Sequence, residues 1–215
     1  MAEAPVRRLR ADARHNRERV LDAAEALFAE LGLQAQTDDI AVRAGVGVGT
    51  VYRHFPTKRE LVEAVIVRRT EALLAAVRAA IDDPDPGQAF RSIFARGAEL
   101  LGGNRALAED VARGMNVPAL PPGIKEELFG AMSALAARAQ AAGQLRPDLC
   151  PADVLMLVAC VAHSVDVAQQ FDPCMRRRFL ALVLDGLRPG ASTPLPGRRL
   201  DLDDLRRLAK QHAAG

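Results

Sequence analysis

Residues 37–61 read TDDIAVRAGVGVGTVYRHFPTKREL, and this stretch decides the fold. Its apolar residues follow the helical period in two short segments, 37–44 and 48–54. Gly45 separates the segments and suits the left-handed conformation that ends a helix, and Pro56 ends the second segment. Two short helices joined by a tight glycine turn predict a helix-turn-helix unit.

A longer amphipathic helix precedes this stretch. Its apolar residues share one helical face: Val20, Leu21, Ala24, Leu27, Phe28 and Leu31. Gly32 is placed to end this helix, and Thr37 is placed to cap the next one. The longer helix packed behind the two short ones predicts a unit of three helices.

The chain after Pro56 continues in the helical period. Thr57 and Glu60 have the spacing of a capping box, which predicts the start of a long helix over 57–81. Further helices are expected at 87–101, 104–115, 124–141, 152–171, 174–186 and 201–212. No stretch alternates polar and apolar residues between hairpin turns, so the predicted fold class is all-α.

Composition narrows the class of protein. The 215 residues are 49% hydrophobic and 26% charged, which indicates a soluble globular chain, and no apolar span is long enough to cross a membrane. No secretory signal is recognisable, so we expect a cytoplasmic protein. The net charge is only +2, but residues 1–20 hold six arginines against three acids, which indicates a local anionic partner.

Enzyme chemistry is not expected. The sequence has no nucleophile motif, no paired carboxylates and no metal-ligand spacing among its three cysteines and four histidines. Residues 45–49 alternate glycine and valine, but Thr50 stands where a dinucleotide loop needs its third glycine, and no strand precedes them. We therefore predict no catalytic residues, no cofactor and no metal.

The helix-turn-helix stretch closely resembles the DNA-binding domain of the TetR family of bacterial transcriptional regulators. The resemblance covers about residues 17–65 and includes Leu27-Phe28-Ala29-Glu30-Leu31-Gly32, Ile40-Ala41, Ala44-Gly45-Val46, Gly49-Thr50-Val51-Tyr52, His54-Phe55 and Lys58-Arg59-Glu60-Leu61. It implies a homodimer that binds double-stranded DNA at an inverted-repeat operator, and a repressor that a small-molecule effector releases. An activator, or a DNA-binding protein without an effector, are the alternatives.

The resemblance and the helical pattern together divide the chain into four parts. They are a basic flexible arm (1–15), a helix-turn-helix DNA-binding domain (16–62), a helical effector-binding and dimerisation domain (63–190), and a linker with an extra helix (191–215). In the family the last two helices of the third part form a four-helix bundle with the partner, and 152–171 and 174–186 are the candidates here. Apolar residues cover more than one face of 152–171, Val161 and Val165 among them, which fits burial by the domain and by a partner.

The expected DNA contacts lie on the two short helices and the start of the long one. Hydroxyl, imidazole and ammonium groups there suit phosphates, which position a protein without reading sequence. Val48 suits a thymine methyl and Arg53 a guanine or a phosphate. The alternative for Tyr52 and His54 is that their side chains belong partly to the core. The predicted DNA-binding residues are Thr37, Val48, Gly49, Thr50, Tyr52, Arg53, His54 and Lys58.

Because the two short helices offer few side chains that can read bases, we expect the basic arm to contribute to recognition. Arg7, Arg8, Arg10 and Arg14 are predicted to enter a narrow A·T-rich minor groove, the alternative being a disordered arm with non-specific attraction. For the effector, the resemblance implies a pocket among the central helices. Its candidate residues are Phe90, Phe94, Arg113, Met115, Asn116, Phe129, Met132, His163 and Asp166, with an ordinary core role as the alternative for the Phe and Met residues.

Overall fold

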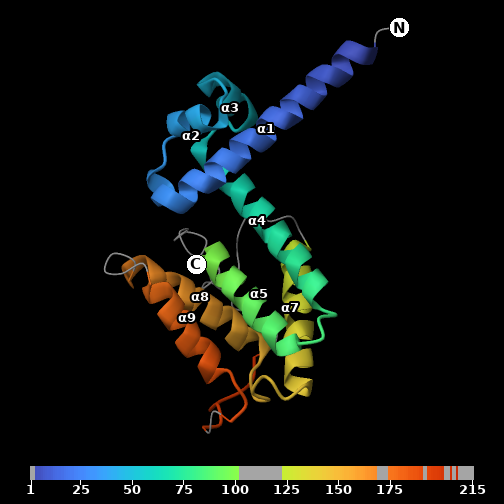
Figure 1. Cartoon of the computed structure of the whole chain (residues 1–215), viewed down its shortest axis with the longest axis vertical. Coiled ribbons are helices and arrows are strands. Elements are labelled where there is room, and N and C mark those ends of the chain that lie inside the picture. The colour runs from blue at the N-terminus through green and yellow to red at the C-terminus, as the bar shows by residue number, and fades with distance from the viewer. Residues whose placement is uncertain are drawn as a thin grey trace. The chain divides into compact units, whose positions relative to one another are not determined.

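The chain is described by a computed structural model that covers residues 3–101, 123–168, 174–190 and 193–200, together with Asp204 and Arg207 (Figure 1). For residues 3–11, 33, 125, 163–168 and 176 the backbone alone is described. Every regular element in these ranges is a helix, which confirms the all-α prediction. The predicted helix 104–115 lies outside the described residues, and so does most of 201–212.

The chain divides into two compact units, with the boundary between Arg68 and Arg69. The first unit holds α1 (Glu3–Leu31), the short 3-10 helix η1 (Gly32–Gln34), α2 (Thr37–Ala44), α3 (Val48–His54) and the first part of α4 (Lys58–Ala80). The second holds the rest of α4, α5 (Pro86–Leu101), α7 (Ile124–Ala141), α8 (Pro151–Ala168) and α9 (Met175–Gly186).

One apolar cluster holds the first unit together. The predicted helix-1 face supplies Val20, Leu21, Ala24 and Leu27, and the two short helices and the start of α4 add Ile40, Ala41, Ala44, Val51, Phe55, Leu61 and Val65. Phe28 and Val46 pack against this cluster and are partly buried. The spacing of the apolar residues therefore predicted which faces of the three helices meet.

Two details of the first unit differ from expectation. Helix α1 begins at Glu3, so residues 3–15 are helical rather than a flexible arm; this segment is rich in alanine and arginine, and Pro5 falls in the first turn, where proline is tolerated. Thr37 does not cap α2 either. The N-cap residue is Gln36, no side chain caps the helix, and Thr37 is the first helical residue and is buried.

The core of the second unit forms where α5 packs against α7 and α8, and α8 also packs against α9. Phe90, Phe94, Leu135 and Val77 are its most deeply buried large side chains. A Cβ atom at Gly97 of α5 would lie 3.4 Å from Val158 of α8, an ordinary van der Waals distance, so the two helices are in close contact here.

Polar side chains fix the start of α5. The backbone N–H of Gln88 donates to the Asp85 carboxylate at 2.9 Å, and the side-chain amide of Gln144 donates to the same carboxylate at 3.0 Å. The Gln144 side-chain oxygen accepts the N–H of Gly87 at 2.8 Å. These donors, the Gln88 N–H first, hold the pKa of Asp85 below its ordinary value. Asp85 thus caps α5 and Gln144 ties that cap to the turn after α7.

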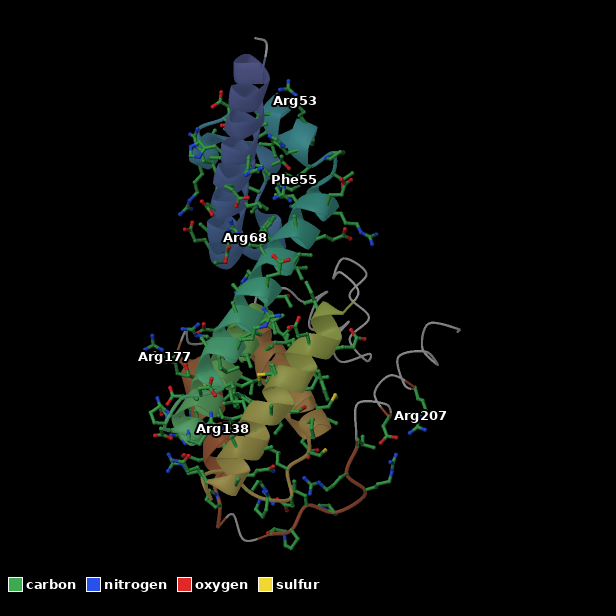
Figure 2. All side chains as sticks on the ribbon, turned by 90° about the vertical axis from the view of Figure 1, so that its right-hand side faces the viewer. Arg53, Phe55, Arg68, Arg138, Arg177 and Arg207 are labelled. Carbon is green, nitrogen blue, oxygen red and sulfur yellow. The ribbon has the colours of Figure 1, made fainter. Side chains whose placement is uncertain are left out.

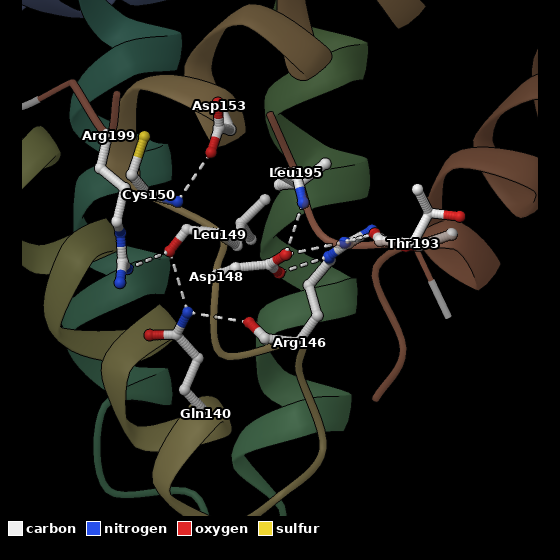
Figure 3. Close-up of polar contacts among 10 residues, drawn as sticks. Gln140, Arg146, Asp148, Leu149, Cys150, Asp153, Thr193, Leu195 and Arg199 are labelled. Atoms are coloured by element: carbon white, nitrogen blue, oxygen red, sulfur yellow. Dashed lines mark hydrogen bonds and ion pairs between the residues drawn. The ribbon is translucent and has the colours of Figure 1, made fainter. Parts of the chain in front are cut away.

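Residues 193–200 form a C-terminal strap that is bonded to the turn between α7 and α8 (Figure 3). Arg146 makes two hydrogen bonds to Asp148, at 2.6 and 2.9 Å, and donates to the carbonyl of Thr193 at 2.7 Å. The N–H of Leu195 donates to the same Asp148 carboxylate at 2.9 Å. We call these contacts of Arg146 and Asp148 with the strap the strap joint.

The strap continues past this joint. Arg199 donates to the carbonyl of Leu149 at 2.7 Å, and Leu200 packs against the small apolar cluster of Phe129, Cys150 and Ala152. Arg198 makes two hydrogen bonds to Asp204, which is buried. The predicted linker is thus bonded to the body of the second unit over 193–200.

Candidate nucleic-acid interface

The turn between α2 and α3 needs glycine at position 45 because its backbone is left-handed. Gly45 has φ 63° and ψ 38°, and its N–H donates to carbonyls of the last turn of α2. A side chain there would also meet the guanidinium of Arg19, whose Nη2 would lie 2.5 Å from the added carbon. Gly47 is the extended N-cap residue of α3, and its carbonyl accepts the N–H of Thr50 at 2.8 Å.

Helix α1 braces the two short helices through arginines. Arg19 donates to the Gly45 carbonyl at 3.2 Å, and the Arg17 guanidinium lies 5.2 Å from the centre of the Phe55 ring, within cation–π range. Arg43 pairs with Glu30 at 2.8 Å, and this hydrogen bond raises the pKa of Arg43 and lowers that of Glu30. These contacts hold α2 and α3 in place against α1.

Helix α3 separates its buried and exposed residues. Val51 and the following Phe55 are buried, whereas Tyr52 is 47% exposed. Arg53 is exposed and points away from the unit, while Phe55 lies among the helices (Figure 2). Among the other predicted contacts, Val48 and Gly49 are exposed and Thr50, His54 and Lys58 are partly buried.

The start of α4 carries the predicted capping box. The N–H of Glu60 donates to the Thr57 hydroxyl at 3.1 Å, and that hydroxyl donates to the Glu60 carboxylate, also at 3.1 Å. The reciprocal bond therefore runs between the two side chains rather than to the backbone of Thr57. Lys58, the first residue of α4, stands beside backbone N–H groups that favour an anion.

Arg68 fastens α4 to α1 and was missed by the sequence analysis. Its guanidinium pairs with Asp22 at 2.7 Å, with Glu18 at 3.7 Å and with Glu25 (Figure 2). The three acids are four and three residues apart, so they share one side of α1. That acidic stripe was the signal available in the sequence, but nothing local identified its partner 43 to 50 residues later.

Comparison with known proteins agrees with this geometry. Residues 20–65 match the profile of bacterial regulatory proteins of the tetR family, and residues 85–189 match that of the C-terminal domain of SbtR-like transcriptional regulators. The TetR regulator SCO0520 of Streptomyces coelicolor is 32% identical, covers 81% of this chain and 99% of its own, and has a TM-score of 0.61. The chain belongs to the TetR family.

Two further relatives extend the comparison. The HTH-type transcriptional regulator UidR of Escherichia coli K12 is 28% identical over 166 residues, which are 73% of this chain and 83% of UidR. LfrR of Mycobacterium smegmatis, solved in complex with proflavine, is 21% identical with a TM-score of 0.56 and covers 86% of this chain and 98% of its own, which shows a shared fold. As a TetR-family member this protein is a DNA-binding transcriptional regulator.

The structure describes the side chains of four of the nine predicted effector residues of this TetR-family protein. Phe90 and Phe94 are buried on α5 with their ring centres 6.0 Å apart, whereas Phe129 belongs to the separate cluster under the strap. Met132 is partly buried on α7, and His163 and Asp166 lie on α8, where the backbone alone is described. The candidates Arg113, Met115 and Asn116 lie outside the described residues.

Each of the two helices expected at a dimer interface carries an exposed apolar side chain. Val161 of α8 is only 2% exposed within one protomer, so it belongs to the core of its own unit. Met156 of α8 is 40% exposed and Leu182 of α9 is 61% exposed. Along the described residues no helix is long and apolar enough to cross a membrane, and no group of side chains suits a metal ion.

Proposed function

We propose that this TetR-family protein is a homodimeric repressor that binds an inverted-repeat operator and leaves it when a small organic effector binds the second unit. The observation that supports DNA binding most directly is that α3 exposes Tyr52 and Arg53 while its Val51 is buried in the core of the first unit. A rigid helix with exposed polar side chains suits the major groove. Because it works on chromosomal DNA, we place it in the cytoplasm.

The contacts divide by role. Thr50, Tyr52, His54 and Lys58 bind phosphates, with Thr37 at the start of α2 as a weaker candidate because it is buried. Gly49 lets the DNA backbone approach closely, while Val48 and Arg53 read bases. A bidentate arginine–guanine pair contributes about 1–3 kcal/mol of discrimination. Arg53→Ala should therefore relax preference at one position of each half-site.

The test of this division is a binding selection on randomised duplexes with the wild type, Arg53→Ala and Lys58→Ala. Lys58→Ala should weaken binding to all sequences and lower the salt slope by about one per protomer, because one phosphate contact is lost. A wild-type site without dyad symmetry, or a Lys58→Ala protein with altered sequence preference and an unchanged salt slope, would contradict the assignment.

The dimer is proposed from the exposed apolar residues of α8 and α9. Leu182→Glu places a charge where we expect the partner, so it should turn the dimer into a monomer at micromolar concentration. Leu195→Glu, at a strap residue that is also exposed, is the matched control and should leave the dimer intact. Sedimentation of both variants beside the wild type measures this directly.

The effector is proposed from the family fold. LfrR shares this fold and was solved with proflavine, and the buried aromatic residues Phe90 and Phe94 lie on α5 of the second unit, where the effector domain is predicted. Screening small organic compounds for release of the operator tests the proposal. A compound that instead strengthened operator binding or was needed for it would favour the activator reading.

A further inference from the structure

Helix α1 extends well past the core that it helps to form. Its first core residue is Val20, whereas the helix begins at Glu3, so residues 3–19 precede the core and span about 25 Å. Figure 1 shows this half of α1 projecting beyond α2 and α3. Arg14 and Arg17 are exposed on it, and the match to the family profile begins only at residue 20.

The arginines of this extension lie in one helical register. We call Arg7, Arg10, Arg14 and Arg17 the arginine stripe; they are three, four and three residues apart, and the same register continues through Leu21, Ala24 and Phe28. Leu21 and Ala24 are buried in the cluster shared with α2 and α3. By register, the positions on this side of α1 therefore change from apolar residues to arginines where the core ends, and the described side chains among them, Arg14 and Arg17, are exposed.

Arg17 fixes the direction of the stripe. Its guanidinium lies over the ring of Phe55, the residue that follows α3, so the stripe begins next to the DNA-reading helix. The neighbouring acids are largely engaged elsewhere: Glu18, Asp22 and Glu25 all pair with Arg68 of α4, although Glu18 also lies 3.8 Å from Arg17. Asp12 is two residues from both Arg10 and Arg14, on the other side of the helix.

We propose that the arginine stripe binds DNA phosphates that flank the half-site while α1 stays helical. The proposal rests on operator binding by the helix-turn-helix, which the stripe extends along the same side of the unit. Arginines presented in a row along one helix suit a row of phosphates, and such contacts add affinity and salt dependence without reading sequence. The flanking sequence is thus held but not read, unlike the A·T-rich minor groove expected of a flexible arm.

Arg14→Ala is the first test, because Arg14 is exposed and lies before the core. Arg188→Ala, which removes the same charge from an exposed site in the second unit, is the control. Arg14→Ala should lower the salt slope of operator binding by about one per protomer, and affinity should fall equally for operators with A·T-rich and G·C-rich flanks. Arg188→Ala should match the wild type.

Ala13→Pro is the second test, because it leaves every arginine in place but breaks the helix between Arg10 and Arg14. Ala13→Ser keeps the helix and serves as the control. A helical stripe predicts weaker DNA binding for Ala13→Pro alone. Circular dichroism and sedimentation check that the variants remain folded and dimeric.

The possible outcomes separate the two proposals. A wild type that selects an inverted repeat, with an unchanged salt slope for Arg14→Ala, overturns the stripe and leaves operator binding intact. Loss confined to A·T-rich flanks, or full affinity of Ala13→Pro, indicates a flexible arm in the minor groove and also overturns it. A wild type that binds no DNA overturns both.

Discussion

The two units of this protein both use polar side chains to join their elements, but they differ in what else those side chains do. In the first unit an apolar cluster closes the core, and Tyr52 and Arg53, the proposed DNA contacts, remain exposed. In the second unit, polar side chains join elements to one another: Gln144 ties the cap of α5, and Arg146, which is 9% exposed, joins the strap to the body. The first unit thus joins its helices through arginines such as Arg68 and also exposes Tyr52 and Arg53 on α3, whereas the second unit uses polar side chains to anchor a segment without regular structure, the strap.

The largest expected effects come from removing core side chains in each unit. Phe94→Ala should cost about 3–5 kcal/mol and Ile40→Ala about 2–5 kcal/mol, because both side chains are fully buried. Hydrogen exchange should show lost protection mainly in the unit that carries the change. Equal loss of protection in both units for either variant would mean that their cores act as one.

The first unit was largely predictable because its signals are local. Gly45 ends a helix, Pro56 ends another, and Thr57 with Glu60 starts a third, each within a few residues. The periodicity of Val20, Leu21 and their neighbours gave the buried face. What failed were the termini of elements, where propensity decides weakly: α1 starts at Glu3, and Gln36 rather than Thr37 precedes α2.

The next effect is the loss of the strap joint. Arg146→Met leaves the Asp148 carboxylate and the carbonyls of Gly186 and Thr193 without their guanidinium donor. The thermal midpoint should fall by several degrees, and exchange protection should be lost first over 193–200. Arg188→Ala, which breaks an exposed pair with Asp185, is the control and should change the midpoint little. Equal effects of the two changes would remove the contrast between buried joint and surface pair.

The strap joint should also weaken in acid. Arg146 first, and then the N–H of Leu195, hold the pKa of Asp148 well below its ordinary value. Because the folded-state pKa lies below the unfolded value of about 3.9, this pair stabilises the fold above about pH 4 and stops doing so as the pH falls further. Urea unfolding should therefore separate the wild type from Asp148→Asn at pH 7 and pH 5, and less at pH 3. A separation that is the same at pH 3 would contradict the pairing.

The helices of the second unit were predicted, but the polar contacts that join them to each other and to the strap were not. The ranges 124–141 and 174–186 match α7 and α9 closely because periodicity is a local property. The bond from Arg146 to Thr193 spans 47 residues, and a stretch rich in proline and glycine reads as a linker whether or not it is anchored. The candidate pocket residues stay a prediction, because composition selects aromatic residues but does not tell which of them meet.

The smallest expected losses of stability come from removing one helix cap in each unit. Thr57→Ala removes the hydroxyl that accepts the Glu60 N–H, and loss of such a cap costs about 1 kcal/mol. Asp85→Ala should destabilise more, because Asp85 accepts from both the Gln88 N–H and the Gln144 side chain and so joins two elements as well as capping one. Urea unfolding of both variants at pH 7 gives the two losses. If Thr57→Ala cost as much as Asp85→Ala, the bond from Gln144 would add nothing to the cap of α5, and the strap would be the only one of these two joints that stabilises the second unit.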